Sequence, residues 1–97
     1  MSDNLAKKLF SKGLAFFKKR KYDDAARIFH EILTINPKNV NSLIVLAQIY
    51  KIKNNNIEYE IILKKIIKLD ENNYQSLNNL ALLYKENNFI EKAEFYF

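Results

Sequence analysis

Residues 43–50 read LIVLAQIY, and residues 77–84, which lie 34 positions further along, read LNNLALLY. The residues that the two stretches share in register are Leu43, Leu46, Ala47 and Tyr50 in the first and Leu77, Leu80, Ala81 and Tyr84 in the second. Steps of three, one and three positions place these side chains on one face of an amphipathic helix. Residues 9–16 hold a weaker copy, with Leu9, Lys12, Gly13 and Phe16 at the same places. The chain therefore repeats one helix at intervals of 34 residues.

The segments between these helices repeat as well. Asn36-Pro37-Lys38-Asn39 and Asp70-Glu71-Asn72-Asn73 are 34 residues apart, and each ends in an asparagine that can cap the next helix. Shorter polar turns at 20–21, 54–56 and 87–88 divide each interval into two helices. We predict helices at 4–19, 22–35, 40–53, 57–69, 74–86 and 89–97. A series of such helix pairs is typical of a solenoid.

Small residues recur where two paired helices would cross. They are Gly13, Ala47 and Ala81 on the first helix of each pair, and Ala25 and Ala93 on the second. Helices approach closely only where their side chains are small. Because a glycine inside a helix costs about 1 kcal/mol relative to alanine, we attribute Gly13 to close packing; a hinge or helix end is the alternative interpretation.

In spacing and in the small, aromatic and proline positions, the pattern resembles the tetratricopeptide repeat. The resemblance covers residues 6–97 and implies an all-α, right-handed α-solenoid of antiparallel helix pairs with about six helices. It divides a single domain, 1–97, into units 6–39, 40–73 and a truncated 74–97. Three residues depart from the family pattern: Lys12 replaces a leucine, Glu71 a proline and Tyr59 an alanine. We expect Tyr59 to splay or shift the second helix pair.

The third unit stops in mid-helix at Phe97, without a polar terminal helix. Solenoids need such a helix for solubility. We therefore expect residues 1–97 to be a fragment of a longer chain or to pair through this end. The residues predicted to form the self-association surface, and with it a homo-dimer, are Ala93, Phe95, Tyr96 and Phe97.

Composition excludes several classes of protein. The chain is 48% hydrophobic and 28% charged, which is typical of a globular protein. It has no cysteine and a single histidine, His30, so we expect no metal site, no cofactor and no catalytic constellation. No apolar run approaches the ~18 residues needed to span a membrane. We expect a cytoplasmic protein that is not an enzyme and does not insert into a membrane.

Positive charge is concentrated in the first unit. Residues 6–39 hold nine lysines and arginines against three acids, a net charge of +6, whereas the whole chain has a net charge of +5. Within this unit, residues 18–21 read KKRK. A basic patch can bind nucleic acid or anionic lipid. The alternative is a solvated helix end, where cations favour the helix dipole. We favour the helix end, since no arginine-rich or glycine-aromatic segment accompanies the patch, and do not expect nucleic-acid binding.

In the tetratricopeptide repeat family, the first helices of successive units line a concave groove that holds peptides. Helical phase predicts that the groove residues are Lys7, Phe10, Leu14, Phe17, Asn41, Ile44, Val45, Gln48, Gln75, Asn78, Asn79 and Leu82. Some members clamp the carboxylate of chaperone C-termini with lysine, arginine and asparagine. The corresponding places here are Phe10, Leu14, Val45, Gln75 and Asn79, which include no cation. We therefore predict an internal apolar or amphipathic segment as the ligand.

The resemblance thus implies a non-catalytic protein–protein interaction module that binds a peptide or helix segment in its groove. Two alternatives stay open. The chain could be a scaffold that self-associates through its C-terminal end, or the N-terminal recognition arm of a larger enzyme such as a glycosyltransferase.

Overall fold

The computed structural model describes residues 2–86, which form five helices. They are α1 (Ser2–Lys18), α2 (Tyr22–Ile35), α3 (Val40–Ile52), α4 (Asn56–Leu69) and α5 (Tyr74–Glu86). These are the first five predicted helices, with every end within two residues of its predicted place. The predicted sixth helix, 89–97, lies outside the described residues, and so do all four predicted self-association residues.

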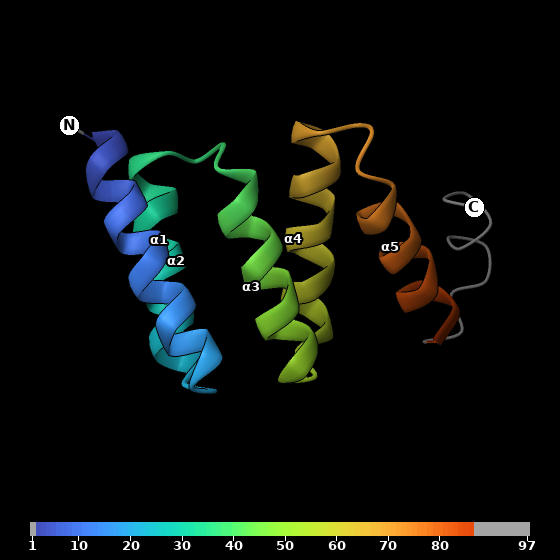
Figure 1. Ribbon diagram of the computed structural model, residues 1–97. Coiled ribbons are helices and arrows are strands. Elements are labelled where there is room, and N and C mark those ends of the chain that lie inside the picture. Colours follow the sequence, from blue (N-terminus) through green and yellow to red (C-terminus); the bar gives the residue numbers. More distant parts are fainter. Residues whose placement is uncertain (1, 87–97) are drawn as a thin grey trace.

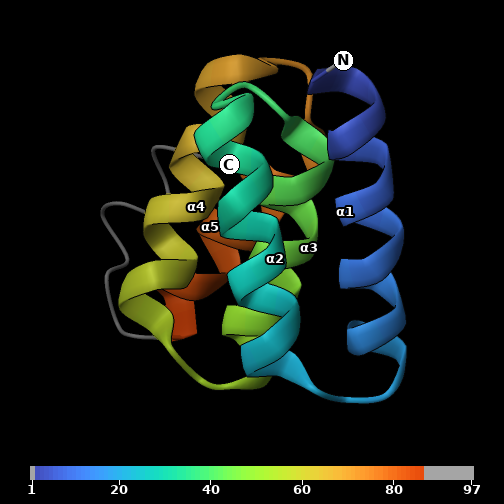
Figure 2. The same ribbon diagram turned by 90° about the vertical axis from the view of Figure 1, so that its left-hand side faces the viewer.

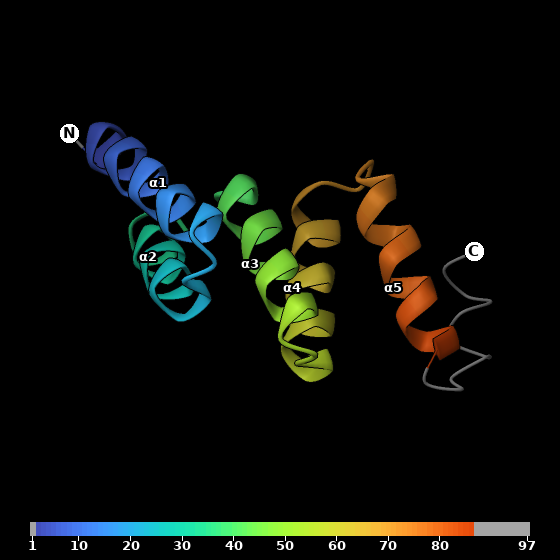
Figure 3. The same ribbon diagram turned by 60° about the horizontal axis from the view of Figure 1, so that its bottom comes forward.

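The helices stand side by side in chain order, each antiparallel to the one before it (Figure 1). The main contacts join consecutive helices, from α1 with α2 through to α4 with α5. Seen from the N-terminal end, the pair α3–α4 is displaced sideways from the pair α1–α2 (Figure 2). The view from below shows the two pairs turned relative to each other (Figure 3). The described chain is therefore a helical solenoid.

Within each pair, the turn is closed by a residue in the left-handed conformation. Arg20 has φ 61° and Asn54, 34 residues later, has φ 57°. In both turns the following amide reaches back five residues: Lys21 N donates to Phe16 O and Asn55 N to Tyr50 O, each at 2.9 Å. This is the hydrogen bond of a Schellman helix ending. The repeat in sequence is therefore a repeat in backbone geometry.

Between pairs, a side chain sets the turn. Asn36 Oδ1 accepts from Lys38 N at 3.1 Å, and Asp70 Oδ1 accepts from Asn72 N at 3.2 Å. Such local bonds form an Asx turn, which needs no proline. Glu71 therefore replaces the family's proline without changing the turn.

The two asparagines predicted to cap helices do so. Asn39 Oδ1 accepts from Ser42 N at 2.9 Å, and Asn73 Oδ1 accepts from Ser76 N at 3.0 Å. Each bond satisfies an amide that a helix start would leave without a partner. Asn73 therefore fixes where α5 begins, which matters for the candidate site below.

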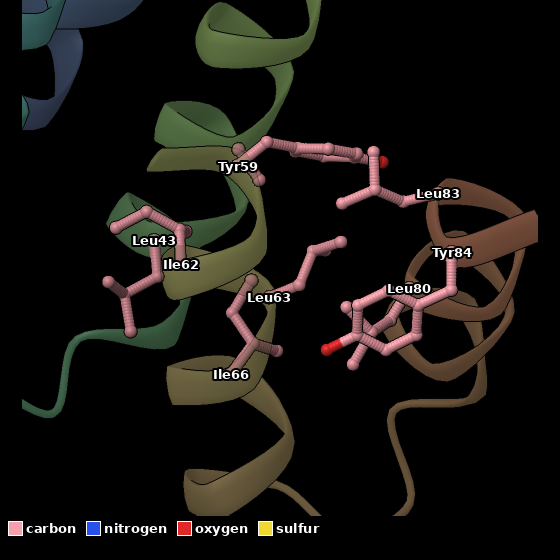
Figure 4. Close-up of a cluster of buried hydrophobic side chains, with 9 residues drawn as sticks. Leu43, Tyr59, Ile62, Leu63, Ile66, Leu80, Leu83 and Tyr84 are labelled. Carbon is pink, nitrogen blue, oxygen red and sulfur yellow. The ribbon is translucent and has the colours of Figure 1, made fainter. Parts of the chain in front are cut away.

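Within residues 2–86 the buried core forms two clusters, one on each side of α3. The first core cluster, between α1, α2 and α3, contains Ala25, Phe29, Ile32, Val45, Leu46 and Ile49. The second core cluster, between α3, α4 and α5, contains Leu43, Ala47, Tyr59, Ile62, Leu63, Ile66, Leu80, Leu83 and Tyr84 (Figure 4). Helix α3 belongs to both clusters and joins the two pairs.

Lys12 is explained by its place in the solenoid. Its equivalents Leu46 and Leu80 are 0% exposed, and each packs with residues of the preceding helix pair. In the described chain no helix precedes α1, and Lys12 is exposed. A lysine can therefore occupy a place that otherwise requires a leucine.

Tyr59 does not splay its helix pair. It is 3% exposed and shares the second core cluster with Ala47 of α3, so α3 and α4 stay packed together. Its ring extends from α4 toward Leu83 on α5 (Figure 4). The expected distortion of the pair is corrected: the volume of the tyrosine is accommodated in the space between α3, α4 and α5.

Two tyrosines at equivalent places, Tyr50 and Tyr84, make polar contacts with the preceding helix pair. Tyr50 Oη on α3 lies 2.8 Å from His30 Nε2 on α2, and Tyr84 Oη on α5 donates to Glu60 Oε1 on α4 at 2.6 Å. Burial raises the pKa of Tyr50, so its hydroxyl stays protonated near neutral pH. Phe16, the equivalent of these tyrosines on α1, carries no hydroxyl. Of these three equivalent positions, the two with a hydroxyl are therefore on α3 and α5, the first helices of pairs that follow another pair.

His30 is uncharged more readily in the folded chain than in the unfolded chain. Partial burial lowers its pKa, Glu58 opposes that change, and Lys65 reinforces it. Since the unfolded chain binds this proton at a higher pH, folded stability falls as the pH drops through the ordinary histidine pKa of ~6.5.

Replacing His30 with glutamine should remove this part of the pH dependence. Between pH 7.5 and 5.5, we expect the unfolding free energy of the natural chain to fall more than that of His30→Gln, because the carboxylates titrate alike in both. Urea unfolding of the two proteins at three pH values measures the difference. If the unfolding free energies of the two proteins changed in parallel with pH, the pKa of His30 would be the same in the folded and the unfolded chain.

Gly13→Ala should destabilise the fold although alanine favours helices. A Cβ at Gly13 would lie 2.8 Å from Cζ of Phe29, whose ring is 0% exposed and packs edge-on against Phe10. Overpacking costs about 1–3 kcal/mol and the gain in helix propensity is about 1 kcal/mol. We expect a net loss of roughly 1 kcal/mol in urea unfolding.

The matched control is Ser11→Ala, at an exposed position on the same helix. It should leave stability unchanged or raise it slightly. Phe29→Leu removes the ring that a Cβ at position 13 would meet. The loss of unfolding free energy in the double variant Gly13→Ala, Phe29→Leu should therefore be smaller than the sum of the losses in the two single variants. Equal behaviour of Gly13→Ala and Ser11→Ala would refute close packing at this crossing.

Candidate functional site

A hollow of about 180 Å³ opens between α3, α4 and α5. Its lining residues are Ile44, Ala47, Gln48, Lys51, Tyr59, Leu63, Ile66, Asn73, Gln75, Ser76 and Asn79. Helices α3 and α5 are the first helices of consecutive pairs, so the hollow lies between the helices that were expected to form a groove. We call it the α3–α5 hollow.

The floor of the α3–α5 hollow is apolar and fixed. Leu63 and Ile66 of α4 are each 1% exposed, and both belong to the second core cluster. Ile44 and Ala47 of α3 complete the apolar lining. Because these side chains are held by the core, the floor is formed before any ligand arrives.

The rim carries amides on both sides. Gln48 projects from α3, and Gln75 and Asn79 lie one turn apart on α5, where Gln75 Nε2 donates to Asn79 Oδ1 at 3.3 Å. An amide side chain has two donor hydrogens and an acceptor oxygen. The rim can therefore pair with both the N–H and the C=O groups of a peptide backbone.

Lys51 and Tyr59 contact each other in the lining of the hollow. The Lys51 ammonium lies 5.4 Å from the centroid of the Tyr59 ring, within cation–π range. Burial raises the pKa of the Tyr59 hydroxyl, and Glu86 adds to that effect. Tyr59 is therefore neutral near pH 7, and the lining has one charge, the lysine.

The predicted groove residues other than Val45 fall into three groups. Those that line the α3–α5 hollow are Ile44, Gln48, Gln75 and Asn79. Those partly buried against the first core cluster are Phe10, Leu14 and Phe17. The residues Lys7, Asn41, Asn78 and Leu82 are exposed and do not line the hollow. Phe10 and Phe17 pack edge-on against Phe29 and Tyr22 of α2, so their rings belong to the first helix pair.

Val45 is a correction to the predicted groove. It is 8% exposed and is part of the first core cluster. It lies beside Leu46 on the face of α3 that covers the first helix pair, whereas Ile44 lies on the face toward α4 and α5. Helical phase alone did not separate these two adjacent positions.

Sequence reasoning missed the floor and one end of the site. It considered the first helix of each pair, and so omitted Leu63 and Ile66, which come from the second helix α4. It also omitted Lys51, one turn beyond Ala47 on α3. The sequence signal for the part of the hollow around Lys51 is Tyr59. A buried tyrosine at a place where the repeat has a small residue needs a space between helices.

Within residues 2–86, no group of three or more histidines and acids could hold a metal ion. In the same residues, no helix is long and apolar enough to cross a membrane.

Residues 62–95 match the family model of the tetratricopeptide repeat. No curated protein matches the sequence of the chain as a relative. The match begins inside α4, includes the whole of α5 and extends past the described residues.

Many solved structures share the fold, including the following three. The crystal structure of MamA has a TM-score of 0.87 at 16% identity, over 95% of this chain and 54% of that one. The CopN–Scc3 complex has a TM-score of 0.85 at 14% identity, over 94% and 54%. The second TPR of Spaghetti (RPAP3), bound to the HSP90 peptide SRMEEVD, has a TM-score of 0.80 at 19% identity, over 94% and 84%.

The chain thus spans about half the length of the first two of these structures. At these identities the likeness concerns the fold, and it confirms the predicted α-solenoid of helix pairs. The sequence match at 62–95 supports the predicted resemblance to the tetratricopeptide repeat over that part of the chain.

Proposed function

We propose that this chain is a non-catalytic interaction module that holds a peptide or helix segment of another protein in the α3–α5 hollow. The observation that carries the proposal is the combination of a fixed apolar floor with amides on both sides of the rim. An apolar floor supplies binding energy through burial, and the amides can pair with a backbone in either direction. This is the chemistry of a peptide-binding surface.

Two of the structural neighbours support this use of the fold. One is the second TPR of Spaghetti with an HSP90 peptide bound, and another is the CopN–Scc3 complex. The lining of the α3–α5 hollow also favours binding over catalysis. Its polar groups are amides, a serine, a lysine and a tyrosine. The raised pKa of Tyr59 keeps that hydroxyl protonated near neutral pH, so it does not serve there as a general base.

Site-specific photocrosslinking tests this function. A benzophenone amino acid replaces Gln48 at the rim in one variant and Lys68, which is exposed on α4 and does not line the hollow, in the other. In a lysate of the source cells, we expect light-dependent adducts with another protein from position 48, and few or none from position 68. Unlabelled chain added in excess should compete them away.

Equal adducts from the two positions would refute a binding surface at the hollow. Adducts that contain only the chain itself would instead support the self-associating scaffold.

A further inference from the structure

We propose that the α3–α5 hollow selects a segment in which an apolar side chain stands next to an aspartate or glutamate. The apolar side chain fills the cavity, and the neighbouring carboxylate pairs with Lys51. This inference rests on the proposed function, because it names the partner of the same site.

The size of the hollow matches one side chain. An apolar cavity of ~150 Å³ in another protein accommodates benzene, and the α3–α5 hollow measures about 180 Å³. A leucine, isoleucine or phenylalanine side chain therefore fits. The floor formed by Ile44, Leu63 and Ile66 offers no polar group to an occupant, so a polar side chain would lose its hydration without replacement.

The charge of the hollow determines what stands beside that apolar side chain. Lys51 is the charged residue in the lining. Within residues 2–86, it forms no ion pair, while Lys53 pairs with Asp23 and Lys64 pairs with Glu60 at 3.0 Å. Asp23 and Glu60 are thus paired with other lysines, and Glu86, whose charge acts on Tyr59, forms no ion pair with Lys51 within residues 2–86. Lys51 is therefore available to a carboxylate from outside.

Tyr59 acts as a positioning residue for this lysine. The face of its ring lies under the ammonium, and the ring itself is 3% exposed. A buried ring cannot follow the movements of a flexible side chain, so it favours the conformations that keep the Lys51 ammonium at the hollow. The alanine that the family places at Tyr59 could not do so.

The carboxylate belongs at the rim and not on the floor. Lys51 is exposed, and burying an isolated charge is costly. The acidic residue is therefore a neighbour of the apolar residue in the ligand. One exposed lysine matches the single charge of a side chain, which distinguishes this site from a clamp of several cations on a chain terminus.

Selection from a random peptide library tests the proposal. Twelve-residue peptides are displayed at the amino end of a phage coat protein, so none has a free carboxyl terminus, and are selected on the whole 97-residue chain. Binders are tested again on Gln48→Trp, which adds a large ring at the rim of the hollow. We expect the peptides that lose binding to this variant to share a leucine, isoleucine or phenylalanine beside an acidic residue.

The charge is then measured with one selected peptide, made with an amidated C-terminus. Replacing its aspartate or glutamate with the corresponding amide should weaken binding to the natural chain roughly threefold to fivefold, as for an exposed ion pair. Fluorescence anisotropy measures the dissociation constants. The difference should disappear in Lys51→Gln, and it should shrink at high salt because an exposed pair is screened. The matched control is Lys53→Gln, which should keep the full difference, since Lys53 does not line the hollow.

The outcomes separate the two proposals. Two results would overturn the inference and leave the proposed function standing. One is peptides that depend on the hollow but contain no acidic residue. The other is a difference between the dissociation constants of the acidic and the amide peptide that persists in Lys51→Gln. Selection that yields no peptide sensitive to Gln48→Trp would overturn both. A dimer in light scattering that is lost in Gln48→Trp, with no peptide selected, would assign the hollow to a second copy of the chain and overturn the inference.

Discussion

The constraint behind this structure is that no helix pair can bury its apolar residues alone. Leu46 and Leu80 are 0% exposed because each is covered by the preceding helix pair. Burial of such a side chain is worth roughly 1.5–3 kcal/mol, so the stacking of pairs stabilises the whole solenoid. Lys12 stands at the same place on α1, where the described chain has no preceding pair, and it is solvated.

The same constraint creates the candidate site. Helices α3 and α5 each pack against α4, which leaves the space between them to be filled by side chains. Tyr59 extends from α4 toward Leu83 on α5 and fills part of that space (Figure 4). It also lines the α3–α5 hollow, which occupies another part. The floor therefore belongs to the core, whereas the rim amides and Lys51 are free of core packing. A rigid floor with adaptable polar groups around it suits recognition of a segment from another protein.

Most of the fold was predictable because it is set by local signals that repeat. The caps at Asn39 and Asn73 each depend on a residue three positions away. The helix crossing at Gly13 depends on one contact, with Phe29. The site was predictable only in part. Val45 and Ile44 are neighbours on one helix, and which of them is buried depends on the angle between helix pairs, which no single helix encodes. The contact between Lys51 and Tyr59 joins two helices and required the structure.

The central claim is that the α3–α5 hollow is the binding surface of this chain. Amide chemical-shift mapping by NMR, with a bound peptide titrated into the labelled chain, tests it most directly. We expect the largest shifts in residues 44–51 and 73–79, with little change in the exposed part of α4 around Ile61 and Lys68. Shifts centred on that exposed part of α4, with residues 44–51 and 73–79 unaffected, would contradict it.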